Sequence, residues 1–293
     1  MDFKTKLHDC RQSIEGAIDR LMPPADRRPR RLHEAMRYSM ESGGKRLRPV
    51  LLMAAAELDG PAHDPLPSAV AVECIHSYSL IHDDLPCMDD GDLRRGKPSC
   101  HRQYDEATAV LAGDALNTQA FLLLARHYRD HTALAVELIE DLATAAGSER
   151  LVGGQTEDIE AERSGRCEAE QLDFIHRNKT AALISAALTM GGRLSRGGGS
   201  GVEILREIGA HLGIAYQIID DVLDATGDTG TLGKTAGADL AADKATFVQL
   251  HGVEASREKA KQHTGEALRF CGDLPGDPAF LCQLIRSLEF RIQ

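Results

Sequence analysis

Apolar residues recur at helical spacing along most of the chain, with charged residues between them. This spacing predicts helices at residues 3–22, 31–41, 50–58, 68–84, 107–128, 131–147, 168–190, 205–224, 254–271 and 278–291. Breakers such as Pro23-Pro24 and the turn-rich stretch 59–67 separate them. No segment shows the alternation of a β-strand. We therefore predict an all-α fold in a single domain over residues 1–293.

The glycine-rich stretch 191–201 follows one of these predicted helices. No predicted strand precedes it and no Gly-Lys-Ser/Thr sequence closes it, so it does not match a phosphate-binding loop. We expect a flexible surface loop.

Composition agrees with a helical globular protein. Hydrophobic residues make up 42% of the chain and aromatic residues only 4%, without tryptophan. The net charge of −11 argues against a nucleic-acid or anionic-membrane partner. The seven scattered cysteines show no zinc-site spacing, the N-terminus is polar, and no apolar run approaches about 18 residues. We expect reduced thiols, no transmembrane segment and a cytoplasmic location.

The chain is most acidic where the apolar segment 68–82 ends. The carboxylates there are Asp83, Asp84, Asp89, Asp90 and Asp92, and Arg94 and Arg95 follow. Clustered oxygen ligands suit Mg²⁺, and an adjacent arginine pair suits a phosphate. The alternative is a solvated acidic loop that its own arginines neutralise.

A second acidic group lies in the predicted helix 205–224. Asp220 and Asp224 are four residues apart, so both carboxylates share one face, and Gln217 lies one turn before Asp221. Like charges at this spacing repel unless a cation lies between them.

Basic residues stand near helix starts. Lys45, Arg46 and Arg48 follow Gly43-Gly44 at the beginning of a helix, where free N–H groups favour an anion such as a diphosphate. Lys179 and Thr180 head an apolar run, and His76 lies about two turns before Asp83. Each also fits an ordinary helix surface.

These segments together resemble the trans-polyprenyl diphosphate synthases, and among them the bacterial farnesyl diphosphate synthases most closely. The matching segments are GGKRLRP at 43–49, SLIHDDLPCMDDGDLRRGKP at 79–98, GGQTED at 153–158, KT at 179–180, YQIIDDVLDATGD at 216–228 and LGKTAGADLAADKATF at 232–247. A single Asp-rich motif has little specificity. Two in this order, with the basic motifs around them, are highly specific.

The resemblance implies the isoprenoid synthase fold, a helical bundle around a central cavity with the two Asp-rich helices facing each other across its mouth, usually as a homodimer. It implies that three Mg²⁺ ions are held by Asp83, Asp84, Asp89 and Asp220, and less directly by Asp221 and Asp224. It implies contacts to the allylic diphosphate from Arg94, Lys179, Thr180, Gln217, Lys234 and Lys244. Isopentenyl diphosphate would be bound by Lys45, Arg48, His76 and Arg95.

The implied reaction needs no nucleophilic side chain. Metals and cations stabilise the departing diphosphate, and the alkene of isopentenyl diphosphate attacks the allylic cation. Tyr78 and Ser79, five and four residues before Asp83, lie about 6–7.5 Å down the helix and are expected to set product length. An aromatic residue at this position resembles the pattern of enzymes that make a C15 product.

Two positions depart from the family pattern. Gly91 stands where many relatives have another aspartate, at a position that we expect to be peripheral. The C-terminal sequence is shorter than the basic tail that often closes the site, although Arg291 could replace that tail.

Other functions are weighed against this one. Geranylgeranyl or geranyl diphosphate synthase differs only in pocket depth. An HD-type metal phosphohydrolase would need further histidine ligands, which the second acidic group lacks. A non-catalytic partner subunit would be expected to have lost one Asp-rich motif, and a terpene cyclase has no need of Lys45, Arg48 and His76.

Overall fold

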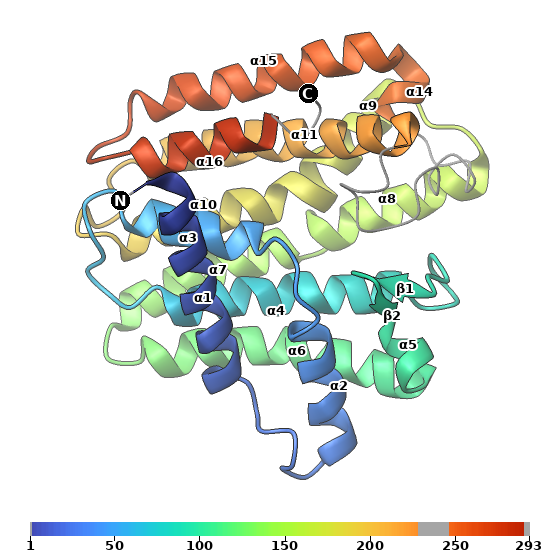
Figure 1. Ribbon diagram of the computed structural model, residues 1–293, viewed down its shortest axis with the longest axis horizontal. Helices are drawn as coiled ribbons and strands as arrows, with labels where there is room; N and C mark the ends of the chain where they lie inside the picture. The colour runs from blue at the N-terminus through green and yellow to red at the C-terminus, as the bar shows by residue number, and fades with distance from the viewer. Residues whose placement is uncertain (1, 228–245, 290–293) are drawn as a thin grey trace. The chain divides into compact units, whose positions relative to one another are not determined.

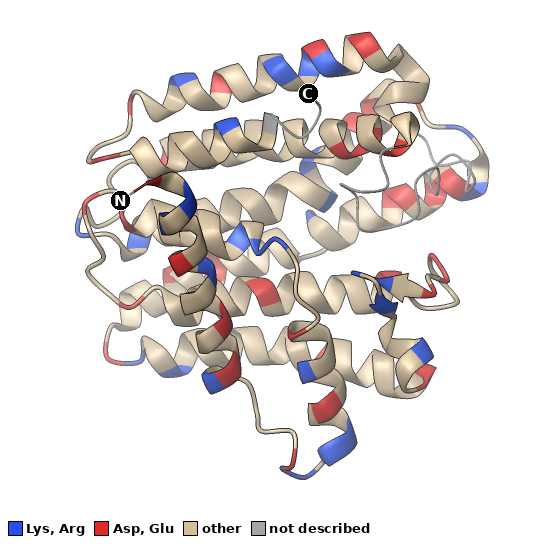
Figure 2. Ribbon diagram, viewed as in Figure 1, with Lys and Arg blue, Asp and Glu red and all other residues tan. Residues whose placement is uncertain are grey.

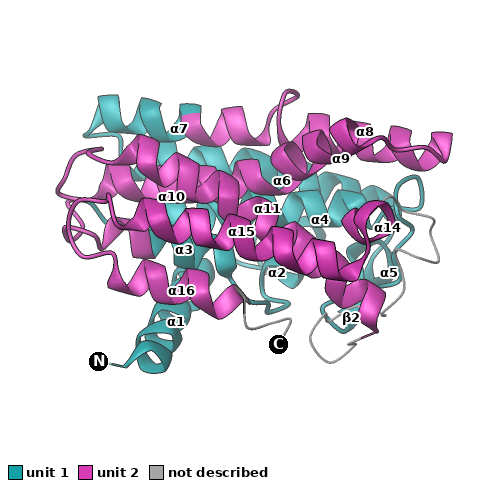
Figure 3. Cartoon of the chain, turned by 90° about the horizontal axis from the view of Figure 1, so that it is seen from above, with its two compact units in different colours: residues 1–53, 63–140 teal, residues 54–62, 141–293 magenta. Residues whose placement is uncertain are grey.

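The computed structural model describes residues 2–227 and 246–289, and that part of the chain is almost entirely helical (Figure 1). It divides into two compact units (Figure 3). The first holds residues 1–53 and 63–140, and the second holds residues 54–62 and 141–293. Both boundaries near residues 53 and 140 fall inside helices. The single domain over 1–293 stays a prediction.

The first unit contains the helices of the N-terminal half. They are α1 (Phe3–Leu21), α2 (Arg30–Met40), most of α3 (Leu47–Ala56), α4 (Leu66–Asp83), the short α5 (Cys100–Gln103), α6 (Glu106–His127) and the start of α7 (Thr132–Ala146). Helix α4 packs along α6. Every α4 residue from Pro67 to Ile75 is buried, because this stretch is apolar on all faces apart from Ser68 and Glu73.

A small hairpin was not expected from the sequence. Strands β1 (Leu93–Arg94) and β2 (Lys97–Pro98) pair antiparallel, with Arg94 opposite Lys97. The two turn residues, Arg95 and Gly96, have φ of +54° and +76°. Positive φ at both central residues matches the tight turn that suits the twist of a hairpin. The run is too short to show an alternating pattern.

The second unit contains the helices of the C-terminal half. They are the end of α7, α8 (Leu151–Ser164), α9 (Ala169–Ile175), the π-helical segment η1 (His176–Ala181), α10 (Ala182–Leu194), α11 (Val202–Thr226), α14 (Phe247–His251), α15 (Val253–Cys271) and α16 (Ala279–Glu289). Helix α11 packs against α10 and α15. Its residues Ile214, Ile218 and Leu223 form a core with Ala260.

Most predicted helices are confirmed within a few residues, but several segments differ. Residues 151–164, for which no helix was predicted, are the continuous helix α8, and the short helices α5 and α14 were not predicted either. The predicted helix 168–190 is divided into α9, η1 and α10. Helix α10 continues to Leu194 into the predicted surface loop, where Gly191 and Gly192 are buried.

Helix α6 is long and apolar enough to cross a membrane, by length and composition only, and it is the one such helix among the described residues. The absence of a transmembrane segment stays a prediction, and the apolar run of α6 is longer than expected from the sequence. Its buried residues, including Leu116, Ala120 and Leu124, belong to the core of the first unit.

Candidate active site

The first Asp-rich stretch begins where α4 ends. Asp84 caps α4, and the chain then turns back so that the N–H of Asp89 donates to the carbonyl of Asp83 at 2.9 Å. The N–H of Gly91 donates to the carbonyl of Asp84 at 3.2 Å. The acidic loop therefore folds over the C-terminus of α4, whose free carbonyls would attract a cation.

Arg94 lies among the carboxylates of this loop. Its guanidinium forms an ion pair with Asp84, in which Nε is 3.1 Å from Oδ2. Burial lowers the pKa of Arg94, but hydrogen bonding to Asp84 and the charges of Asp84, Asp83 and Asp89 raise it overall. Burial raises the pKa of Asp84 despite the opposing effect of Arg94. Thus Asp83, Asp84 and Asp89 converge on one positive group.

Gly91 is not peripheral in this arrangement. A Cβ atom there would lie 2.8 Å from Oδ1 of Asp84. A side chain at position 91 would therefore displace the Asp84 carboxylate or the loop itself.

The basic residues of the first unit form a second group beside α4. An Arg48 nitrogen lies 3.4 Å from Nε2 of His76, and the contact places the proton of the neutral ring on Nδ1. Burial, and then the charge of Arg48, hold the pKa of His76 well below its usual value. Lys45 and Arg48 flank Arg46, which is buried. Arg46 forms ion pairs with Glu15 and Glu73, so it is not a free surface cation as the sequence suggested.

Tyr78 is buried within the first unit, where its ring meets the His82 ring edge to face at a centroid distance of 5.7 Å. Ser79 instead donates its hydroxyl to the carbonyl of His76 at 3.0 Å, which occupies its polar group within the helix. Of these two residues, which were expected to set product length, Tyr78 has the larger apolar side chain.

The polar residues of the second unit meet along η1 and α11. Thr180 donates to Gln217 at 2.9 Å, and Gln217 donates to Oδ1 of Asp221 at 3.0 Å. The N–H of Phe247 donates to Oδ2 of Asp221 at 2.9 Å. Both oxygens of Asp221 thus accept protein hydrogen bonds, while its predicted role as a metal ligand stays a prediction.

Asp220 and Asp224 lie one turn apart in the same helix, as the spacing predicted. Figure 2 shows acidic positions gathered toward this end of α11. Asp224 is buried, whereas Asp220 is partly exposed.

Lys179 has a partner that the sequence did not identify. Its Nζ lies 2.5 Å from Oδ2 of Asp158, in the GGQTED segment of α8. The close approach of α8 to η1 depends on Gly154, where a Cβ would lie 2.4 Å from the backbone nitrogen of Lys179. In the sequence, only its place among the acidic residues of GGQTED pointed to Asp158 as a partner for a cation. Lys234, Lys244 and Arg291 lie outside the described residues.

The aspartates fit Mg²⁺ by their chemistry. Mg²⁺ commonly takes one or two carboxylates and completes its shell with water and substrate phosphates. Within residues 2–227 and 246–289, no three His, Cys, Asp or Glu side chains are grouped closely enough to hold a metal ion by themselves.

Comparisons with known proteins agree with this geometry. The family model described as polyprenyl synthetase matches residues 29–270. The farnesyl diphosphate synthase of Bacillus subtilis is 42% identical over 97% of both chains. The large subunit 1 of the chloroplastic heterodimeric geranylgeranyl pyrophosphate synthase of Arabidopsis thaliana is 45% identical, over 91% of this chain and 73% of that one.

A solved structure of a related enzyme has a similar fold. The geranyltransferase of Helicobacter pylori, complexed with magnesium and isoprenyl diphosphate, is 33% identical with a TM-score of 0.84. The match covers 98% of this chain and 96% of that chain.

Proposed function

The chain belongs to the polyprenyl synthetase family and is a prenyltransferase with the isoprenoid synthase fold, and from this premise we propose that it makes (2E,6E)-farnesyl diphosphate. The substrates are isopentenyl diphosphate and an allylic diphosphate, either dimethylallyl or geranyl. The enzyme joins them head to tail. The observation that carries the choice of a C15 product is the buried ring of Tyr78, five residues before Asp83.

We assign the allylic diphosphate to the aspartates and to the cations near them. Asp83, Asp84, Asp89 and Asp220, and less directly Asp221 and Asp224, would hold Mg²⁺, and three ions are expected. When bound, Mg²⁺ would neutralise the negative charge that grows on the leaving diphosphate. Arg94, Lys179, Thr180 and Gln217 would orient the same group, as would Lys234 and Lys244. Asp221 would hold Gln217 in place through its hydrogen bond.

Arg94 is placed to serve two charged groups. It neutralises Asp84 through its ion pair. Its planar guanidinium, whose donors suit phosphate oxygens, would also orient the allylic diphosphate beside these aspartates. The same side chain thus stabilises the acidic loop and would bind the leaving group.

The second substrate is assigned to the basic group of the first unit. Lys45, Arg48 and Arg95 would bind the diphosphate of isopentenyl diphosphate, with His76 as a neutral donor through Nδ1. The alkene then attacks the allylic cation, and a proton is lost from the new carbon chain to the released diphosphate. No protein nucleophile is required.

We further propose a homodimer that works in the cytoplasm. Similarity does not decide the product, because the farnesyl and geranylgeranyl relatives are 42% and 45% identical to this chain. A geranylgeranyl product is therefore the second candidate, and pocket depth at Tyr78 distinguishes the two.

The test is product analysis with purified protein, Mg²⁺ and isopentenyl diphosphate, with dimethylallyl and geranyl diphosphate supplied in turn. The expected dephosphorylated product from either starter is the C15 alcohol. A C20 alcohol would retain prenyl transfer and exclude farnesyl diphosphate as the end product. If no condensation occurs although both substrates bind, the proposed activity of the isolated chain is wrong.

A further inference from the structure

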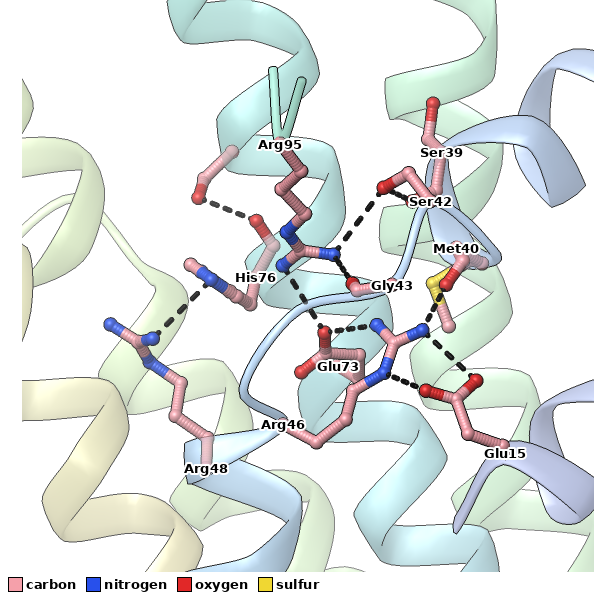
Figure 4. A network of polar contacts seen from close by, with 11 residues as sticks. Glu15, Ser39, Met40, Ser42, Gly43, Arg46, Arg48, Glu73, His76 and Arg95 are labelled. Atoms are coloured by element: carbon pink, nitrogen blue, oxygen red, sulfur yellow. Dashed lines mark hydrogen bonds and ion pairs between the residues drawn. The ribbon is translucent and has the colours of Figure 1, made fainter. Parts of the chain in front are cut away.

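One buried carboxylate in the first unit contacts two guanidiniums (Figure 4). Glu73, in the apolar helix α4, is 1% exposed. Its Oε1 lies 2.6 Å from Nη1 of Arg46 and 3.5 Å from Nη2 of Arg95. A buried charge is costly unless it is paired, so these contacts fix the position of all three groups.

Arg46 is fully engaged in this cluster. Besides Glu73, it forms an ion pair with Glu15, with Nε at 2.7 Å from Oε1, and donates to the carbonyl of Met40. Arg46 has a φ of +50°, which turns its side chain into the protein while its neighbours Lys45 and Arg48 remain at least partly exposed. Burial lowers the pKa of Arg46, but Glu15 and Glu73 outweigh burial and raise it. Arg46 therefore anchors the loop from within and is not itself a diphosphate ligand.

Arg95 is held differently. It donates to the carbonyl of Gly43 and, at 3.5 Å, to the hydroxyl of Ser42, so the hairpin turn is tied to the loop that carries Lys45. Its contact to Glu73 is longer than that of Arg46. Glu73 is thus neutralised mainly by Arg46. Arg95 is oriented by Glu73 while it keeps positive charge for an anion.

We propose that Glu73, held by Arg46, is a positioning residue that aligns Arg95 and the 42–48 loop to bind the diphosphate of isopentenyl diphosphate. The proposal rests on the function proposed above. Glu73 does not touch the substrate in this assignment; it acts through Arg95.

A simpler role for Glu73 predicts the opposite result. If Glu73 only neutralised Arg46, replacing it by glutamine would leave extra positive charge near the site and would tighten diphosphate binding. If Glu73 positions Arg95, the same change weakens binding, because the alignment is lost. The sign of the change therefore separates the two roles.

The experiment compares Glu73→Gln with the matched control Glu15→Gln. Both remove a carboxylate from Arg46, but only Glu73 reaches Arg95. For Glu73→Gln we expect KM for isopentenyl diphosphate to rise about tenfold, with less than about a twofold change in KM for the allylic substrate. Glu15→Gln should change both by less than about twofold.

A binding measurement without turnover completes the test. Calorimetric titration with inorganic diphosphate in EDTA should show weaker binding to Glu73→Gln than to the wild-type chain or to Glu15→Gln. Equal or tighter binding overturns the positioning role. If Glu73→Gln does not fold, the double variant Arg46→Met with Glu73→Gln removes both members of the buried pair, and the Glu15 partner of Arg46 is 45% exposed and can be solvated. It should show the same weakening.

The two proposals fail in different ways. If the wild-type chain condenses the substrates and KM for isopentenyl diphosphate is unchanged in Glu73→Gln, only the positioning role is wrong. If the wild-type chain does not condense them, the proposed function is wrong. In that case Glu73-dependent binding of inorganic diphosphate would still support the positioning of Arg95.

Discussion

The guanidinium of Arg94 forms an ion pair with Asp84, the buried carboxylate that caps α4. A proposed metal ligand and a proposed substrate ligand thus neutralise each other in the first unit. A cation held by Asp84 would compete with Arg94 for this carboxylate.

Asp84→Asn tests that competition. The variant keeps the size of the side chain but loses the charge, and we expect kcat to fall at least about a hundredfold because the leaving diphosphate loses stabilisation. The Mg²⁺ concentration needed for half-maximal activity should also rise. Steady-state assays over a Mg²⁺ series measure both.

Asp90→Asn is the matched control in the same loop. Asp90 is exposed and pairs with Arg102 at 3.1 Å, outside the proposed metal set. It should change kcat by less than about threefold. An unaltered Mg²⁺ requirement in Asp84→Asn would show that Asp84 is not a metal ligand.

Tyr78→Ala is expected to lengthen the product. The change removes a buried ring and leaves space below Asp83, so the chain can grow beyond C15. Chromatography of the dephosphorylated products should show C20 or longer alcohols. Tyr104→Ala, which removes a ring that packs on Tyr38 in the first unit, should still give the wild-type product. An unchanged product in Tyr78→Ala would remove Tyr78 as the floor of the pocket.

Gly154→Ala is expected to lower both stability and activity. The added Cβ would meet the backbone of Lys179 at 2.4 Å, so α8 or η1 must move, at a cost of about 1–3 kcal/mol. Gly265→Ala in α15 is the control, since no atom lies within 4 Å of its Cβ position. That change should stabilise the protein by about 0.5–1 kcal/mol. Thermal melts and assays at saturating isopentenyl diphosphate measure both; equal effects of the two substitutions would contradict close packing at Gly154.

We expect His263 to make the folded protein less stable in acid. Its Nδ1 lies 2.9 Å from Nδ1 of His211, and burial, followed by the charge of His211, lowers its pKa from 6.5 to about 4. The unfolded chain therefore takes up a proton between these pH values that the folded chain does not, and the free energy of unfolding falls as pH decreases through this window.

His263→Gln should make the melting temperature less sensitive to pH between about 6.5 and 4. His8→Gln on the exposed side of α1 is the control and should keep the wild-type profile. The same pH dependence in both variants would show that the partly buried pair of His211 and His263 does not contribute.

The helical pattern predicted most of the fold because apolar spacing decides which face of a helix is buried. It did not predict the end of α10, where Gly191 and Gly192 look like a loop in the sequence but are buried in the helix. A Cβ at Gly192 would lie 2.5 Å from Leu205, so this glycine serves close packing. Packing between the consecutive helices α10 and α11 decided the structure there, and local propensity did not.

The candidate site was also only partly predictable. The aspartates and most of the basic residues could be proposed from the sequence, whereas the residues that pair with these basic residues could not. Asp158 and Glu73 gained roles only through contacts with Lys179 and Arg95, each about 20 residues away. Glu73 did leave a signal, since it is an acid in an otherwise apolar stretch of α4 and needs a partner when buried.

The π-helical segment η1 carries Lys179 and Thr180 between two α-helices. An α-helix turns about 100° per residue, and a π turn accommodates one additional residue in nearly the same rise. Deleting one residue from His176–Ala181 would thus restore a regular helix with α9 and α10 in nearly their present orientations, and the change would fall on the residues of η1 themselves. The chain length of this segment, as much as its residue types, sets the direction in which Lys179 and Thr180 point.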